Sequence, residues 1–338
     1  MKKELDRIIE RKKEVLPEGV NILGPDSGLS SETSADWLTN LLCQMYVQHG
    51  ITKNRDKLIA DIKSGNCRPW FAVRDGDAIA AAALVKQSDG SVEVGRAVSF
   101  EKNVGGLLML LAAADHWAAT NEPLVAEVRV SDNFLGVPSS EATQVISIGH
   151  LGLSSHALVP AFNHGEPNRQ EMFLFSSSKK IESGLPLFLP NDKNGIEFIT
   201  QTGLAMAKGI LSFQPEVRFG TEVLSFGWQI VQSEPFSVVL PSQHGVTLER
   251  VINESELFSS FTLIPLSTNP NNTGAMIECL NNNFIPCGVD RNLDQDGHLV
   301  ILFGRLRTNT LVAPIRIISE LFEIDLVEAI NKINNKFR

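Results

Sequence analysis

The pair Gly105-Gly106 stands between a predicted strand and a predicted helix. Apolar residues alternate with small or polar ones from Ser91 to Ser99, as is typical of a strand. The run from Leu107 to Ala119 is rich in Leu and Ala, which favour helices. A glycine-bearing turn at a helix start gathers backbone N–H groups and partial positive charge in one small space. The spacing predicts an anion cradle suited to phosphate. The alternative is an ordinary turn in which the glycines only relieve crowding.

Two carboxylates lie near this turn and are candidates for acid–base chemistry. In simple alternation Glu93 shares its strand face with three small residues, which leaves space above the strand, and Arg96 falls on the opposite face with the valines. A β-bulge would reverse this phase. Glu127 lies in the next predicted strand. A carboxylate beside a bound amine acts as a general base, whereas the plainer alternative is two solvent-facing strand residues. The three small residues are Gly95, Ala97 and Ser99.

The elements around the turn form an antiparallel meander followed by a helix. Asp75-Gly76 and Asp89-Gly90 separate three predicted strands, and Asp-Gly between apolar runs is a strong hairpin signal. Two helices are predicted before the meander, the first capped at Thr33 as in a capping box. The predicted strands are 70–73, 78–85, 91–99, 124–130, 157–160 and 171–176, with a helix over 139–151.

This order of elements resembles the GNAT family of N-acetyltransferases. The resemblance is carried by WFAVRDGDAIAAAALV, SVEVGRAVSFEKNVGGLLMLL, LVAEVRVSDN and HLGLSSHALVP, and it covers roughly Val20 to Ser178. It implies an α+β fold with a mostly antiparallel central sheet flanked by helices. It also implies that the strand before the turn splays from the next strand, with the pantetheine of acyl-CoA in the gap. The pyrophosphate would then rest on the backbone amides of the turn.

The resemblance also assigns residues. The family turn reads Gln or Arg, two residues, Gly, one residue, then Gly or Ala, and each register on this sequence misses one position. Glu93 and Glu127 would be catalytic. The family's general acid, a Tyr after the fifth strand, has no counterpart in this sequence, because its one tyrosine, Tyr46, lies in the first predicted helix. Backbone amides near Ala97, Val98 and Ser99 would hold the thioester carbonyl. The other implied cofactor-binding residues are Lys102, Asn103, Val104, Gly105, Gly106 and Asn133.

The later part of the chain suggests a weaker second copy. FTLIPLSTNPNNTGAMIECLNNNFIPCGVDRN runs strand, polar loop, helix, break and strand, like LVAEVRVSDN with HLGLSSHALVP. No comparable glycine turn precedes its helix, so this half is expected to bind no CoA; an unrelated accessory α+β half is the alternative. Helices are predicted over 196–211 and 317–333, and strands over 223–231 and 236–240. The expected divisions are an N-terminal helix (1–19), an acyl-CoA-binding domain (20–178) and a second half (185–338).

Composition narrows the class of protein. The 338 residues carry a net charge of −9, which argues against a nucleic-acid surface, and no apolar run is long enough to span a bilayer. The N-terminus lacks the apolar core of a signal peptide, and the four cysteines are scattered, which fits free thiols in the cytoplasm. His150, His156 and His164 do not match zinc spacing and are expected in loops or on the surface. No metal is expected, and Asn292–Gly297 is interpreted as an Asp-Gly hairpin and not a calcium loop.

These features together predict a cytoplasmic acyltransferase. The expected reaction transfers an acyl group, most simply acetyl from acetyl-CoA, to a small-molecule amine by direct attack. A homodimer is compatible with the sequence. One rival is a catalytically silent acyl-CoA-binding or scaffolding protein, suggested by the missing tyrosine and the imperfect turn. Another is a longer-chain acyltransferase of the homoserine-lactone-synthase type, suggested by the Phe- and Leu-rich second half.

Overall fold

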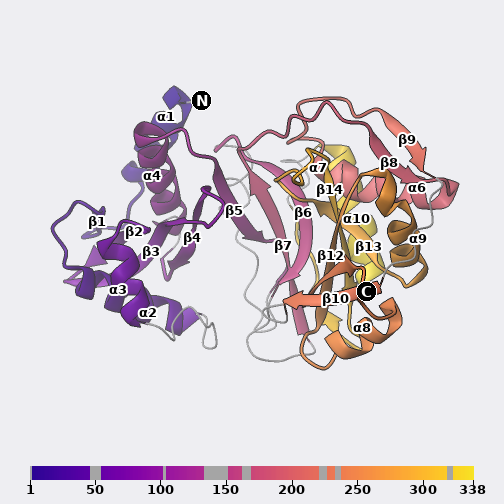
Figure 1. The fold of residues 1–338 in the computed structure, drawn as a ribbon. Helices are drawn as coiled ribbons and strands as arrows, with labels where there is room; N and C mark the ends of the chain where they lie inside the picture. Colours follow the sequence, from indigo (N-terminus) through magenta and orange to yellow (C-terminus); the bar gives the residue numbers. More distant parts are fainter. Residues whose placement is uncertain are drawn as a thin grey trace. The chain divides into compact units, whose positions relative to one another are not determined.

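The structure, a computed structural model, divides into two compact units (Figure 1). Unit 1 comprises Met1–Val128 and Ser140–Leu153, and unit 2 comprises Arg129–Ser139 and Ser154–Arg338. Both combine sheets with covering helices, so the predicted mixed fold is confirmed. The described residues are 2–45, 55–101, 104–132, 151–161, 169–220, 227–232, 237–317 and 323–338.

Unit 1 is built on a sheet in the order β1-β2-β3-β4-β5. Strands β1 to β4 pair antiparallel, whereas β4 and β5 pair parallel. The strands are β1 (Asn21–Leu23), β2 (Cys67–Arg74), β3 (Asp77–Lys86), β4 (Val92–Ser99) and β5 (Leu124–Arg129). The helices are α1 (Lys2–Glu14), α2 (Ser31–Met45), α3 (Arg55–Lys63) and α4 (Val104–Ala119).

The two Asp-Gly turns form as predicted. Asp75 and Gly76 have φ values of 55° and 91°, the left-handed pair that a two-residue hairpin turn requires. At the next turn Gly90 has φ 81°, and its N–H donates to the carbonyl of Gln87 at 3.1 Å. The strands β2, β3 and β4 therefore form the predicted antiparallel meander, and β4 ends at Ser99, before the turn that leads to α4.

Alanines in β3 let helices pack closely on both faces of the unit 1 sheet. Ala80 and Ala82 belong to a core with α1 and α4, and Ala81 and Ala83 to a second core with α2 and α3. The side chains of α4 face that first core almost all round, which explains its apolar sequence. In Figure 1, α1 and α4 lie on one side of these strands, and α2 and α3 on the other.

Two local interactions fix α2 and α3. The cap of α2 is Ser30, whose Oγ accepts a hydrogen bond from the Thr33 N–H at 3.0 Å, so the predicted cap at Thr33 is wrong by one turn. The Arg55 guanidinium donates to the Asp36 carboxylate at 2.9 Å and joins the two helices. Thr33 hydrogen-bonds the Ser30 hydroxyl and supports the cap without being it.

Unit 2 contains a sheet in the order β7-β6-β13-β14-β12-β11-β10, with β15 beside β7. Its neighbours pair antiparallel except β11–β12 and β15–β7, which are parallel. β6 joins β13 through one residue pair, Ala157 with Gly288. The strands are β6 (Ser154–Ala161), β7 (Arg169–Ser177), β10 (Gly227–Gln232), β11 (Ser237–Ser242), β12 (Phe261–Ser267), β13 (Ile285–Val289), β14 (Val300–Leu306) and β15 (Leu311–Val312).

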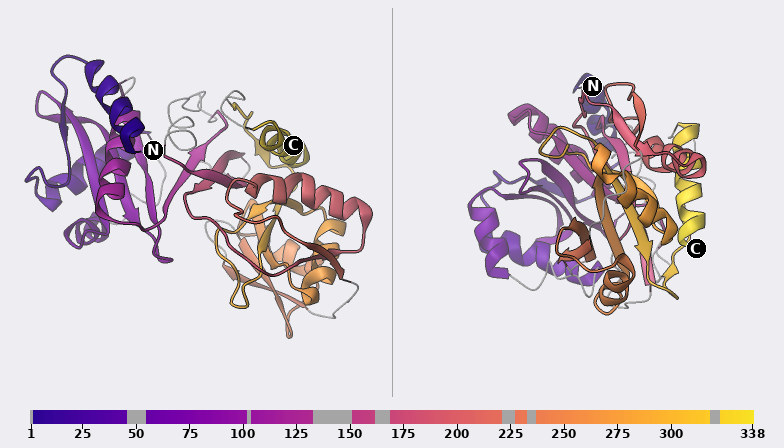
Figure 2. Two further views of the ribbon diagram at one scale, coloured as in Figure 1. Left: turned by 90° about the horizontal axis from the view of Figure 1, so that it is seen from above. Right: turned by 45° about the vertical axis from the view of Figure 1, so that its right-hand side comes forward.

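The helices of unit 2 begin and end elsewhere than predicted in two places. Residues 193–207 run as one helix with a π-helical middle (Figure 2), so the predicted 196–211 is shifted, and α10 begins at Ile324 and not at Ile317. Among the described helices none is long and apolar enough to cross a membrane. The segments are α6 (Lys193–Ile199), η3 (Thr200–Leu204), α7 (Ala205–Ala207), α8 (Leu248–Ser255), η4 (Pro270–Asn272), α9 (Thr273–Asn281) and α10 (Ile324–Phe337), with a small sheet of β8 (Leu187–Pro190) and β9 (Val217–Gly220).

The grouping of β6 and β7 differs from the expected division at Ser178. Both strands group with unit 2 because β6 pairs with β13 of the same sheet. The expected N-terminal helix, 1–19, also packs within unit 1, where Leu5 and Ile9 are buried in the α4 core. The domain boundaries read from the sequence remain a prediction.

His156 and Glu171 are two of the buried titratable side chains of unit 2. His156, expected in a loop or on the surface, lies in β6 with 5% of its surface exposed, and its Nδ1 is 2.8 Å from the Val289 carbonyl. Burial lowers the pKa of His156 to about 4, because imidazolium would lose its hydration. Burial likewise raises the pKa of Glu171 to about 7, although Arg129 at 3.7 Å opposes the rise. His150 and His164 lie outside the described residues.

These two groups should give stability opposite dependences on pH. Between pH 6.5 and about 4 the unfolded chain protonates His156 and the folded chain does not, so stability is lost as pH falls. Between pH 4.5 and about 7 the folded chain keeps Glu171 protonated, so stability is lost as pH rises. Relative to wild type, His156→Asn should gain stability as pH falls from 6.5 to 4.5, and Glu171→Gln should lose it.

Urea unfolding across that range measures both effects. Each variant should diverge from wild type by up to about 1.4 kcal/mol per pH unit, the free-energy equivalent of one proton. If the free energy of unfolding of each variant, plotted against pH, stays parallel to that of wild type, neither group changes protonation on unfolding.

Candidate functional site

Strands β4 and β5 separate soon after they begin. Their parallel register spans two residue pairs, Val92 with Leu124 and Glu93 with Val125. Beyond these pairs β4 continues to Ser99 along β3, while β5 continues to Arg129. The splay that the resemblance implied is therefore present within unit 1.

A β-bulge interrupts β4 within this splayed part. Ala83 pairs with Gly95 and Ala81 with Val98, so the register shifts between them. Arg96 in the bulge has φ 49°, a left-handed conformation that is uncommon outside glycine. Because of this extra residue, the side chains that follow it in β4 point to the opposite faces of the sheet from those that strict alternation would give them.

The phase reversal corrects the face predicted for Glu93. Val94 and Ala97 pack on the α4 core, whereas Val98 packs on the α2–α3 core. Glu93 precedes the bulge and therefore shares its face with Val98, not with Ala97 or Ser99. Simple alternation fails here because it assumes that each residue of β4 lies opposite one residue of β3, whereas at the bulge two residues of β4 lie opposite one residue of β3.

Glu93 is held in place on the α2–α3 face of the sheet. Its Oε2 accepts a hydrogen bond from Gln87 Nε2 at 2.7 Å. Its carboxylate folds over Gly95, where any side chain would collide with it. In register, Glu93 lies beside Val85 of β3, which in turn lies beside Cys67 of β2. The missing side chain at Gly95 thus makes room for the carboxylate.

Glu127 lies on the same face of the neighbouring strand. Ala126 and Val128 are buried in the α4 core, so Val125 and Glu127 point to the opposite face. Val125 is the register partner of Glu93, and the Glu127 side chain is exposed. The structure therefore places both predicted carboxylates on one face, on strands that diverge.

The turn before α4 brings the end of β4 against the first turn of the helix. A Cβ atom on Gly105 would lie 2.9 Å from Ser99 Cβ, which is closer than such atoms approach. The Ser99 hydroxyl donates to the Glu101 carbonyl at 2.7 Å, and Arg74 pairs with the Glu101 carboxylate at 2.6 Å. The first turn of α4 has no acidic side chain, which suits an anion at its N-terminus.

Some predicted site residues fall inside this region and others outside the described chain. Val104 is buried at the start of α4, and Gly105 and Gly106 are partly exposed in its first turn. Lys102, Asn103 and Asn133 lie outside the described residues. Among the described residues no group of His, Cys, Asp and Glu side chains could hold a metal ion.

Two residues near Glu93 were missed in the sequence. Gln87 binds the Glu93 carboxylate, and Arg96 reaches the same face, where its Nη1 lies 3.8 Å from Cys67 Sγ. The only signal for Arg96 was a charged residue between Gly95 and Ala97, two small neighbours in a strand. Simple alternation assigned it to the valine face.

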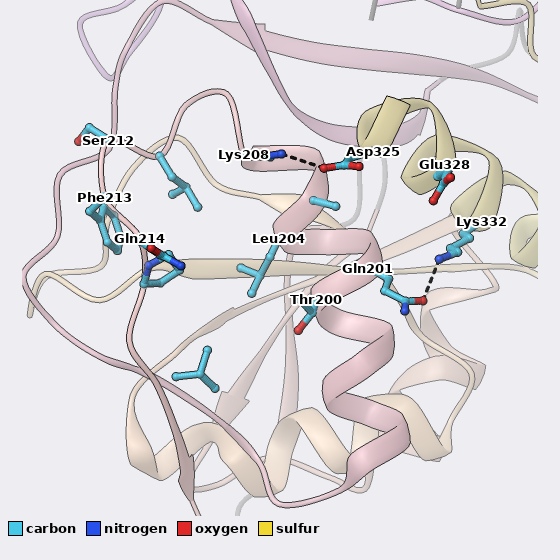
Figure 3. Close-up of a pocket in the computed structure, with 14 residues that line it drawn as sticks. Thr200, Gln201, Leu204, Lys208, Ser212, Phe213, Gln214, Asp325, Glu328 and Lys332 are labelled. Atoms are coloured by element: carbon cyan, nitrogen blue, oxygen red, sulfur yellow. Dashed lines mark hydrogen bonds and ion pairs between the residues drawn. The ribbon is translucent and has the colours of Figure 1, made fainter. Parts of the chain in front are cut away.

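Unit 2 contains an open pocket of about 840 Å³ between η3–α7 and α10 (Figure 3). Two contacts join polar side chains of its lining: Lys208 Nζ is 2.8 Å from Asp325 Oδ2, and Lys332 Nζ donates to Gln201 Oε1 at 2.8 Å. The pocket contains none of the residues singled out in the sequence. Its lining is Thr200, Gln201, Leu204, Ala205, Lys208, Leu211, Ser212, Phe213, Gln214, Pro215, Val217, Asp325, Glu328 and Lys332.

Comparisons with known proteins give structural likenesses alone. No protein-family model matches the sequence, and no curated protein matches it. A GNAT-family acetyltransferase from Desulfovibrio desulfuricans is 14% identical, covers 47% of this chain and 97% of its own, and gives a TM-score of 0.34. An acetyltransferase from Salmonella typhimurium with acetyl-CoA is 12% identical, covers 47% and 93%, and gives 0.35. The aminoglycoside 6′-N-acetyltransferase from Enterococcus faecium is 12% identical, covers 46% and 95%, and gives 0.33.

The element order of unit 1 and the splayed pair β4–β5 are those that the sequence resemblance implied. The fold of this part of the chain is GNAT-like. The solved structures are similar to about half of the chain, and this likeness concerns the fold. The features on which the candidate site depends are the bulge, the splay and the α4 N-terminus.

The close approach of Ser99 and Gly105 gives a test of the turn. Gly105→Ala should lower the free energy of unfolding by about 1–3 kcal/mol, because its methyl group would collide with Ser99 Cβ. Ser99→Gly should rescue this loss in the double variant, whereas Ser99→Ala, which keeps Cβ, should not. Additive losses in Gly105→Ala/Ser99→Gly, measured by urea unfolding, would contradict the contact.

Proposed function

We propose that this chain is an acyl-CoA-dependent N-acyltransferase that transfers acetyl from acetyl-CoA to a small-molecule amine. The observation that carries the proposal is the splay of β4 from β5 immediately before the N-terminus of α4. A gap lined by strand backbone suits an extended pantetheine chain. The α4 N-terminus offers partial positive charge to the pyrophosphate.

The residues proposed for cofactor binding follow from that placement. Backbone N–H groups near Ala97 and Ser99 would hold the thioester carbonyl and stabilise the oxyanion that develops during attack. The amides of the turn, from Lys102 through Gly106, would hold the pyrophosphate, with Asn133 as a further contact. The proposed location is the cytoplasm, where the four cysteines, all free, stay reduced.

The proposed reaction is direct attack. The neutral amine nitrogen bonds to the thioester carbonyl carbon, and the C–S bond breaks to release CoA thiolate, which takes up a proton. Glu93, positioned by Gln87, would accept the proton that the amine loses, either directly or through a water molecule. Glu127 on the same face is the second candidate for this base.

We also propose that unit 2 contains a degenerate GNAT-like half. Its segment β11-α8-β12 repeats the strand, helix and parallel strand of β4-α4-β5, and among the described residues its parallel register is also two residue pairs long. The turn before α8 is closed, however. The Val246 N–H donates to the Trp228 carbonyl at 3.0 Å, and the Thr247 hydroxyl accepts from the Arg250 N–H. With these amides satisfied internally, no acyl-CoA is expected there.

Calorimetric titration with acetyl-CoA tests the cradle. Gly106→Glu should weaken binding at least tenfold, because its carboxylate would face the pyrophosphate at the helix N-terminus. Gly106→Gln is the matched neutral control and should weaken binding less. Equal affinities in the two variants, both with wild-type circular dichroism, would rule out an anion at this turn.

Titration with CoA and with a long-chain acyl-CoA separates the two rival functions. A marked long-chain preference favours an acyltransferase of the homoserine-lactone-synthase type. Binding without turnover over a panel of amines favours a catalytically silent acyl-CoA-binding protein.

Rates with a substrate amine test the base. Glu93→Gln should lower kcat about 10²–10⁴-fold and remove the fall in rate that protonation of a base causes at low pH. The Gln side chain keeps an oxygen to accept the Gln87 hydrogen bond, so folding should be preserved. Glu127→Gln is the matched control on the next strand and should have the smaller effect. If Glu93→Gln kept wild-type kcat and the same acidic limb, Glu93 would be a surface carboxylate only.

A further inference from the structure

Arg96 occupies the β-bulge, three residues after the last residue pair of β4 with β5. Its φ of 49° is a conformation that glycine adopts freely and that costs free energy for other residues. Gly95 beside it leaves room for the Glu93 carboxylate. The chain thus places a large cationic side chain in a strained position next to a glycine.

The Arg96 guanidinium makes no ion pair within the part of the chain that the structure describes. Its hydrogen bond is to Cys67 Sγ at 3.8 Å, and a thiol is a weak acceptor. The half-buried Arg68 and Arg305 differ, since each meets a carboxylate oxygen, Asp115 at 2.8 Å and Glu256 at 2.5 Å. A guanidinium with five donors and such a weak partner is suited to a further anionic group.

Arg96 and Glu93 place opposite charges on one face of the sheet. Both charges act on the pKa of the Cys67 thiol, which burial raises to about 11. The positive charge of Arg96 lowers this pKa, and the negative charge of Glu93 raises it. On β3, Val85 lies beside Glu93 and Ala83 lies beside Gly95 in the register, and Ala83 is buried in the α2–α3 core. Three residues along a strand span roughly 10 Å between Cα atoms, and the side chains shorten the distance between charges.

We infer that the acceptor is an amine that also carries a carboxylate, as a free amino acid does. The carboxylate would bind Arg96 and the amine would lie toward Glu93; this assignment rests on the proposed acyltransferase function. The new bond joins the amine nitrogen to the acyl carbon, the C–S bond breaks, the amine proton leaves to Glu93 or water, and the thiolate is protonated. The product is an N-acyl amino acid and CoA. Polycationic amines are disfavoured because Arg96 repels them.

Matched acceptor pairs test this inference on the full-length protein with acetyl-CoA. The pairs are histidine with histamine, phenylalanine with phenylethylamine, and lysine with cadaverine, which differ by the carboxylate. We expect at least one amino acid to be acylated with a kcat/KM at least tenfold above that of its decarboxylated partner. Equal or higher activity on the decarboxylated amines would overturn the inference.

Variants at Arg96 make the test specific to the residue. Arg96→Gln should raise KM for the amino acid at least tenfold, with acetyl-CoA affinity unchanged, and should shrink the preference over the decarboxylated amine. Arg96→Gly should do the same and relieves the positive φ, so it guards against misfolding in Arg96→Gln. Arg68→Gln, which removes an arginine already paired with Asp115, is the control and should leave KM unchanged. An unchanged KM in both Arg96 variants would contradict the inference.

Direct titration of the amino acids into the protein without acetyl-CoA separates the two proposals. Binding that both Arg96 variants abolish supports the carboxylate site even if acetyl-CoA does not bind, in which case the acyltransferase proposal alone fails. Acetyl-CoA binding with no affinity for any of the three amino acids, and turnover of carboxylate-free amines only, refutes the Arg96 assignment and leaves the acyltransferase proposal standing.

Discussion

The β-bulge at Arg96 is the constraint on which the candidate site depends. One extra residue in β4 moves Ala97 to the α4 face and leaves Glu93 and Val98 on the α2–α3 face. In a regular strand the side chains would continue to alternate between the two faces, and Ala97 would lie on the same face as Glu93. The bulge follows the two residue pairs that β4 forms with β5 and adds local twist to β4 where the two strands are already separate.

The rest of unit 1 supports that local distortion. Alanines on both faces of β3 let α4 and α2 pack against the sheet, so β4 is held from both sides by buried side chains. At its far end β4 is fixed again, because Ser99 meets the first turn of α4 at Gly105. A strand held at its start by register with β5 and at its end by α4 can tolerate a strained residue between.

Local sequence rules predicted the elements of unit 1 well and the geometry of the site poorly. The Asp75-Gly76 turn and the strand before α4 follow from chemistry within a few residues. The bulge does not, because it depends on how β3 packs opposite β4. The capping-box pattern selected Thr33 because Asp36 lies three residues on, whereas Ser30, the actual cap, has Thr33 at that position. His156 was misplaced for a related reason: its burial comes from contact with β13, where its partner Val289 lies 133 residues later in the chain. The two carboxylates were found, but the face they share was not.

The narrow junction between β6 and β13 has a consequence for how unit 2 moves. One residue pair, Ala157 with Gly288, and the contact of His156 with the Val289 carbonyl join β7-β6 to β13-β14-β12-β11-β10. Proteins open locally in roughly contiguous cooperative units. Backbone amides on the two sides of so short a register are therefore expected to exchange with solvent as two groups, although the strand order is continuous.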